Sequence, residues 1–366
     1  MNNLFPFILT LLIPGFLSTI FTPYWTRKTE SFGVTIPQKV YSSPELKKLR
    51  KQYVLYSSFT AFIITILLFF LSSNASESTA SIQLTVAIFL YLGLSFIIYL
   101  KFHSDMKKMK QSSNWNKGKS QQLFINTNFH SEKLTYSNLW FLISFVVTFI
   151  IIFFTFENYH LLPEQLPIQY GFSGEVTSWA DKSYRSALLF PVMTLYMTFL
   201  FLFVNTVIAR SKQQIDSENP EESLKQNAIF RKRWSLFIII GGTALTLLLS
   251  FIQVTFFYAF NPSFIMYVVL FFTLLIIGGA IYLSFTTGQG GSRVKHGTVN
   301  SNGKSINRDD DRYWKLGIFY FNKEDPALFL EKRFGVGWTI NLARPLAWVI
   351  FLVIIGSAIA IPLLLS

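Results

Sequence analysis

The chain contains no cysteine, and charged residues are scarce in it. Of its 366 residues only 14% are Asp, Glu, Lys or Arg, against about 25% in a typical soluble protein. Without cysteine there is no disulfide framework, no thiolate nucleophile and no cysteine-based metal site. The missing charge is concentrated in long uncharged stretches, which is typical of a chain whose surroundings alternate between lipid and water.

Eight apolar stretches of about 20 residues have cores without Asp, Glu, Lys, Arg or His. As helices, stretches of this length cross about 30 Å of hydrocarbon. The predicted spans are residues 3–22, 53–71, 82–101, 138–156, 187–209, 235–256, 263–285 and 346–365. Asn261-Pro262 is a turn signal between the sixth and seventh spans. The first span lacks the basic residues and cleavage site of a signal peptide, so we expect it to stay as a helix.

Lysine and arginine are confined to alternate loops. Thirty of the 32 lie in residues 23–52, 101–137, 210–234 and 286–345. The positive-inside rule places these loops in the cytoplasm of a bacterial plasma membrane, and an even number of spans puts both termini outside. Anionic headgroups facing these loops account for the net charge of +13, so lipid is the expected partner and nucleic acid is not.

The predicted fold is an all-α integral membrane protein with a small strand-containing cytoplasmic element. Ser43-Pro44-Glu45 and Asn219-Pro220-Glu221 both predict the capped start of a helix that leads into a span. The recurrence suggests two four-helix halves, although capped basic loops are common in membrane proteins. The predicted divisions are a first half (1–156), an extracytoplasmic motif loop (157–186), spans five to seven (187–285), a flexible linker (286–305), a cytoplasmic module (306–345) and the eighth span (346–366).

The segment after Ser43 shows an amphipathic pattern. Leu46, Leu49 and Tyr53 recur at helical spacing, whereas the basic residues Lys47, Lys48, Arg50 and Lys51 are expected to face elsewhere. This pattern predicts a helix that lies at the inner lipid surface and runs into the span.

The loop 157–186 is the most distinctive outer segment. Pro163 and Pro167 restrict its backbone, Gly174 permits a tight turn, and Trp179 suits the membrane interface. We predict that these four residues and Lys182 bind a ligand, such as a peptide. The acids of the loop and His160 have no recognised metal-ligand spacing, so we expect no metal, no cofactor and no enzymatic activity. The alternative is a catalytic site built on a carboxylate pair from Glu164 and Glu175.

The inner loop before the last span carries the second group of candidates. The residues are Arg312, Trp314, Lys315, Lys332 and Arg333. They suit either a cytoplasmic regulator or anchoring to lipid headgroups.

Polar residues inside the predicted spans are few. Asn205 and Gln253 suit either hydrogen bonds between helices or a polar transport site. Ion-coupled carriers usually keep a titratable group in the membrane, and the eight span cores have none.

The outer loop resembles the extracytoplasmic motif of SdpI-type toxin-immunity proteins and of a wider set of uncharacterised bacterial membrane proteins. Leu162-Pro163, Pro167, Gly174, Trp179 and Lys182 carry the resemblance, and Gln169 stands where those proteins often have a histidine. The segments Asp310–Gly317 and Lys332–Thr339 resemble a second module of the wider set. The resemblance implies a sensor or immunity-like protein that protects against a membrane-active toxin. A small-molecule transporter, or an accessory subunit of one, is the alternative.

Overall fold

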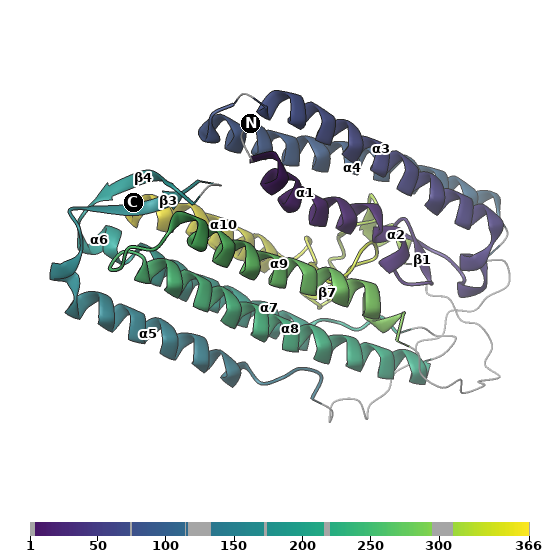
Figure 1. Cartoon of the computed structure of the whole chain (residues 1–366). Coiled ribbons are helices and arrows are strands. Elements are labelled where there is room, and N and C mark those ends of the chain that lie inside the picture. Colours follow the sequence, from purple (N-terminus) through teal and green to yellow (C-terminus); the bar gives the residue numbers. More distant parts are fainter. Residues whose placement is uncertain are drawn as a thin grey trace.

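Long helices dominate the computed structural model, which describes residues 4–73, 75–113, 115, 133–171, 174–215, 220–294 and 310–365 (Figure 1). The long helices are α1 (Leu4–Ile20), α3 (Pro44–Ser72), α4 (Glu77–Ser112), α5 (Leu142–Glu157), α7 (Leu189–Arg210), α8 (Pro220–Val254), α9 (Pro262–Thr287) and α10 (Pro345–Leu365). Two short helices are α2 (Thr22–Trp25) and α6 (Tyr184–Ala187). Within the described residues, seven helices are long and apolar enough to cross a membrane. The chain is therefore a multi-pass membrane protein of the all-α class.

The seven helices long enough to cross a membrane coincide with the last seven predicted spans, and the predicted first span coincides with α1. Helix α1 has only 17 residues and is not among the seven, whereas α5, with 16 residues, is extended to 20 by a 3-10 turn that begins at Asn138. Its buried side chains Ile8, Leu12 and Phe16 pack in one cluster with residues of α3 and α4 such as Leu68 and Leu84. Ala75 of the α3–α4 connection packs against the same cluster, and α1 starts at the end of the molecule where that connection lies (Figure 1).

The helices pack in a group of three and a group of five, not as two four-helix halves. Helices α1, α3 and α4 pack together, while α5, α7, α8, α9 and α10 form the second group and meet the first along α1 and α9 (Figure 1). The predicted first half is wrong for α5, which packs against α7 and α8. Short connections keep α3 beside α4 and α8 beside α9, but the long segment between α4 and α5 imposes no such constraint.

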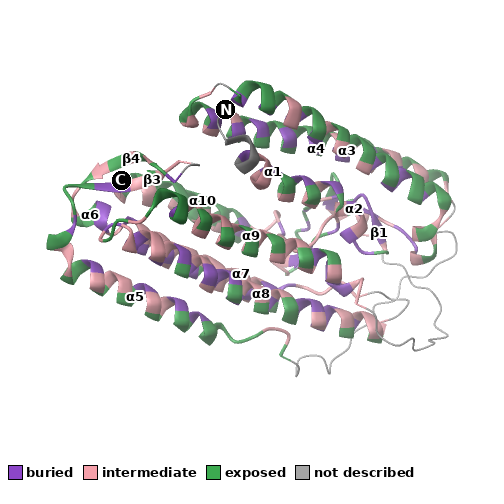
Figure 2. Cartoon of the chain, in the orientation of Figure 1, coloured by how far each residue is buried: buried purple, intermediate pink, exposed green. Residues whose placement is uncertain are grey.

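The outward faces of the helices are apolar and exposed (Figure 2). Phe59, Phe70, Phe89 and Phe153 are each more than 60% exposed. A monomeric soluble protein rarely exposes contiguous apolar surface of this extent, because water penalises it. Lipid chains on these faces remove that penalty.

The basic segments that precede two of the spans are the first turns of α3 and α8. The Ser43 side chain caps α3 and accepts a hydrogen bond from the Leu46 amide, as predicted. The segment runs into the span as one helix, as predicted, because α3 is continuous from Pro44. Arg50 is buried, against expectation: its guanidinium lies 4.0 Å from the Tyr41 ring centroid and donates to the Tyr41 carbonyl.

Eight short strands form four antiparallel pairs within the described ranges. The pairs are β1–β2 (Glu30–Ser31, Val34–Thr35), β3–β4 (Gln165–Tyr170, Val176–Asp181), β5–β6 (Trp314–Lys315, Phe319–Tyr320) and β7–β8 (Phe329–Glu331, Trp338–Ile340). The last two pairs are the strand-containing element predicted before the final span. We call residues 310–344, which include both pairs, the inner module. The first two pairs were not predicted.

The predicted flexible linker is partly wrong. Gln289, Gly290 and Gly291 are buried in a short 3-10 helix that follows α9. The Gln289 amide donates to the carbonyls of Lys332 and Gly337, and its oxygen accepts from the Gly337 amide at 2.7 Å. These bonds hold the start of the segment against the inner module. Residues 295–305, the rest of the predicted linker, lie outside the described residues.

Candidate functional site

The β3–β4 hairpin covers the end of the second helix group where α8 ends and α9 begins. Leu166 of β3 is fully buried and packs with Leu162, Ala187 and Phe256. The Tyr170 hydroxyl lies 2.7 Å from the Thr255 hydroxyl, just beyond the end of α8. The hairpin is therefore anchored on the helices and is not a free loop.

Two glycines let the end of this hairpin approach other helices closely. Gly174 has a φ of +82°, and a Cβ there would collide with the carbonyl of Pro262 at the start of α9. A Cβ on Gly171 would collide with the carboxylate of Glu77 at the start of α4. The hairpin therefore touches both helix groups, at the start of α9 and at the start of α4.

The five predicted ligand residues have two different environments. Pro167 is buried opposite Trp179 in the strand register, and Lys182 donates to the Leu162 carbonyl at 2.7 Å. These two residues and Gly174 support the hairpin. Pro163 and Trp179 are exposed, and Trp179 has 53% of its surface accessible. Trp179 is the large apolar side chain that an external ligand can reach.

At the opposite end of the bundle, the inner module holds a fully buried carboxylate. Arg231 Nη2 lies 3.0 Å from Glu331 Oε1, which also accepts from Asn227 Nδ2 at 2.7 Å. The other carboxylate oxygen pairs with Arg27, in the segment after α2. Because Arg27 lies between α2 and α3 in the first helix group and Arg231 lies on α8, Glu331 ties both groups to the module.

The tip of the β7–β8 hairpin inserts into the first helix group. The Phe334 ring lies 4.6 Å from that of Tyr99 and 6.1 Å from that of Tyr53, measured between centroids. The Gly335 amide donates to the Thr26 hydroxyl at 3.1 Å. The module is therefore packed between the two helix groups and joins them at the end of the bundle opposite the β3–β4 hairpin.

The five residues predicted in the inner loop also differ in their exposure. Arg333 and Trp314 are only 1% and 4% exposed, and Arg333 pairs with Asp310 and Asp311 while its guanidinium lies over the Trp314 ring. This burial removes both side chains from the surface that a regulator or a headgroup would contact. The exposed members of the set are Arg312, Lys315 and Lys332.

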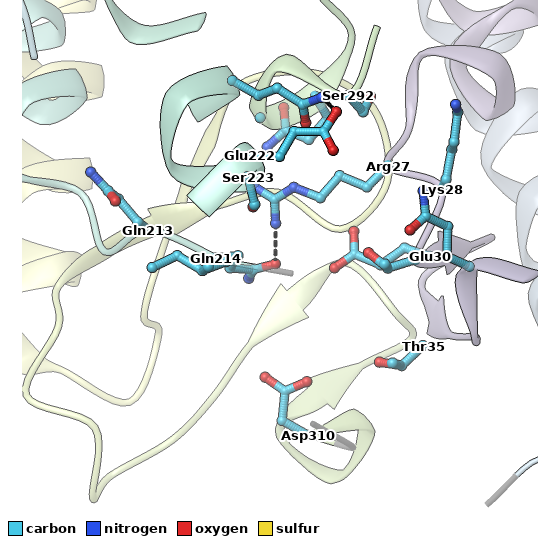
Figure 3. Close-up of a pocket in the computed structure, with 16 residues that line it drawn as sticks. Arg27, Lys28, Glu30, Thr35, Gln213, Gln214, Glu222, Ser223, Ser292 and Asp310 are labelled. Carbon is cyan, nitrogen blue, oxygen red and sulfur yellow. Dashed lines mark hydrogen bonds between the residues drawn. The ribbon is translucent and has the colours of Figure 1, made fainter. Parts of the chain in front are cut away.

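A polar cavity of about 210 Å³ lies beside the Arg27–Glu331 pair (Figure 3). Arg27 donates to Gln214 Oε1 at 2.6 Å across it. Glu30 also lines the cavity, is 6% exposed, and has an Oε2 without a hydrogen-bond partner in the described part of the chain. Burial raises the pKa of Glu30 against the opposing effect of Arg27 and Arg333. Its carboxyl is therefore placed to take up a proton.

The two polar residues predicted inside spans make hydrogen bonds between helices. Asn205 donates to Asn138 Oδ1 at 2.7 Å and accepts from the Ser235 hydroxyl. Gln253 donates to the Thr155 hydroxyl and the Ala187 carbonyl. Helix packing accounts for both residues.

The sequence did not single out Arg27, Glu30, Arg231 or Glu331. Arg231 lies in a basic run that suited the lipid surface, and Glu331 lies beside Lys332-Arg333, which suited an exposed loop. One usable signal was the four-residue spacing of Asn227 and Arg231, which puts both on one helix face. Where the structure describes the chain, no three His, Asp or Glu residues are placed to hold a metal ion.

The comparisons with known proteins match both regions just described. A domain of unknown function (DUF1648) matches residues 145–195, which contain the β3–β4 hairpin. A family of unknown function (DUF5808) matches residues 323–348, which contain β7 and β8. Each match covers less than half of the chain. No curated protein and no solved structure matches it.

Proposed function

We propose that the chain is a non-enzymatic sensor or immunity-like protein of a bacterial plasma membrane. It binds a peptide at the β3–β4 hairpin on the outer side. The bound or free state of the hairpin is transmitted to the inner module. One observation carries the proposal: α8 reaches both regions. Arg231, near its inner end, holds Glu331, and Gln253, near its outer end, donates to Ala187 beneath the hairpin. At 1.5 Å per residue these two side chains are roughly 33 Å apart along one helix.

The proposed topology has eight spans with α1 as the first, and both termini outside. Helix α1 starts, and α10 ends, at the end of the molecule that carries the β3–β4 hairpin (Figure 1). The basic loops lie at the other end and face the cytoplasm. This arrangement puts the hairpin outside and the inner module inside.

The proposed ligand is a cationic membrane-active peptide. The outer loops contain five acidic and two basic residues, so they attract positive charge. Both hairpin strands have an edge unpaired within their two-stranded sheet, and an extended peptide can add to such an edge. Trp179 offers an aromatic face beside this edge, of the kind that often dominates binding energy.

The test is protection of a sensitive bacterium that expresses the chain, challenged with melittin, magainin and nisin. The proposal expects the inhibitory concentration of at least one peptide to rise, and Trp179→Ala to abolish the rise. Trp140→Ala is the matched control, because Trp140 is equally exposed at 54% but lies at the inner end of α5. No protection against any of the three peptides, or equal loss in both variants, contradicts the proposal. Uptake of a small solute into proteoliposomes would instead favour the transporter alternative.

A further inference from the structure

A second cavity, of about 610 Å³, lies between α1, α4 and the inner module. We call it the inner cleft. Ser18 and Thr22 of α1 and α2, Leu92 and Phe96 of α4, and Ser284 of α9 are among its lining residues. Ser284 lies three residues before the inner end of α9, which places the cleft at the level of the inner leaflet's headgroups.

The floor of the inner cleft is the β7–β8 hairpin tip and contributes a lysine. Lys332 lines the cleft, and its side chain is exposed to it. The protein around Lys332 desolvates its ammonium group and lowers its pKa. Within the described ranges no carboxylate lies within ion-pair distance of Lys332, whereas its neighbours Glu331 and Arg333 both have charged partners.

The walls of the inner cleft combine apolar and hydroxyl groups. Leu92 and Phe96 on one side, and Phe319 of the module on another, are 49%, 37% and 43% exposed. The hydroxyls of Ser18 and Thr22 donate to backbone carbonyls of α1, those of Gly15 and Ser18, and keep lone pairs free to accept. A lysine beside hydroxyl groups suits the anionic, hydroxylated headgroup of a lipid, and the apolar wall suits a lipid acyl chain.

We propose that the inner cleft binds an anionic glycerophospholipid of the inner leaflet. Its phosphate lies against Lys332, and an acyl chain lies along Leu92 and Phe96. The lipid supplies the negative charge that the protein does not place beside this lysine in the described ranges, and anionic lipid stabilises a basic residue near the membrane surface by about 1 kcal/mol. The proposal does not depend on peptide binding at the outer hairpin.

The experiment measures the unfolding temperature of the purified full-length protein in phosphatidylcholine micelles while phosphatidylglycerol is titrated in. Phosphatidylglycerol should raise the unfolding temperature of wild type until the effect saturates. It should raise that of Lys332→Arg to the same extent. Lys332→Gln should need about fivefold more phosphatidylglycerol, the equivalent of about 1 kcal/mol for one basic residue near anionic lipid. Lys315→Gln is the control, because Lys315 is also exposed on the module but lies outside the cleft lining.

A second variant tests the cleft without changing charge. Leu92→Trp puts an indole ring against the apolar wall and should weaken the phosphatidylglycerol response while stability in phosphatidylcholine stays as in wild type. A Lys332→Gln response equal to wild type overturns the proposal. An equal response to free glycerol phosphate also overturns it, because a soluble phosphate would then be sufficient.

Discussion

At the scale of single residues, the inner module depends on charges that are buried and paired. Glu331 is fully buried with two arginines, Arg27 and Arg231. Removing an ion from water is costly, so such a group is stable only when its partners surround it. The loss of one member leaves the others buried without a partner.

We predict that Glu331→Gln lowers the free energy of unfolding by about 3–5 kcal/mol, because two buried arginines lose their shared carboxylate. Chemical denaturation in detergent micelles measures the change. Glu324→Gln, at an exposed position of the same module, should change it by about 0.5 kcal/mol or less. Equal stabilities of the two variants would show that the buried pairs contribute little.

Glu30 should make stability depend on pH. Because burial raises its pKa above the ordinary 4.5, the folded chain binds this proton more tightly than the unfolded chain. The contribution of Glu30 is therefore most favourable at low pH, and stability falls as pH rises from about 4.5 through the folded pKa. The Glu30→Gln variant does not titrate there, so its unfolding temperature relative to wild type should increase with pH. A difference that stays constant between about pH 5 and pH 8 contradicts this assignment.

At the scale of elements, the outer hairpin is held by a close backbone approach. Gly174 combines a positive φ with contact to the Pro262 carbonyl, so a side chain there has both strain and a collision. Gly174→Ala should destabilise the docked hairpin by about 1–2 kcal/mol or more. The measurement is the rate of tryptic cleavage after Lys182, which is half-buried in the docked hairpin. This rate should be higher in Gly174→Ala than in wild type.

A glycine in open surroundings provides the control for that change. Gly278, inside α9, has no atom within 4 Å of the position that an added Cβ would take, so Gly278→Ala should leave cleavage at Lys182 unchanged. Similar cleavage of wild type and Gly174→Ala would show that the contact with Pro262 does not hold the hairpin.

The element boundaries followed from local chemistry, whereas their packing did not. Uncharged runs located the long helices, Ser43 caps α3 where its sequence predicted, and the turn predicted at Asn261-Pro262 separates α8 from α9. The place of α5 could not be predicted, because contacts across a long connection leave no periodic signal. Arg50 and Arg231 were assigned to the lipid surface, since a basic run shows only that charge is present and not which member is buried.

At the scale of the whole molecule, the inner module joins two helix groups that meet elsewhere along α1 and α9. Glu331 reaches both groups through arginines, and Phe334 inserts into the first. The sequence predicted the two regions that carry candidate sites. It did not predict which residues of each region are exposed and which support the structure. Trp179 and Lys332 remain exposed, while Gly174, Lys182 and Arg333 support structure, because each role depends on long-range contacts.

The account requires the outer hairpin and the inner module to lie on opposite sides of the membrane. The chain has no cysteine, so single substitutions at exposed positions, Thr177→Cys on the hairpin and Lys323→Cys on the module, give clean labelling sites. With a membrane-impermeant maleimide on intact cells, the first variant should be labelled and the second only after permeabilisation. Labelling of both variants in intact cells, or of neither, would contradict the account.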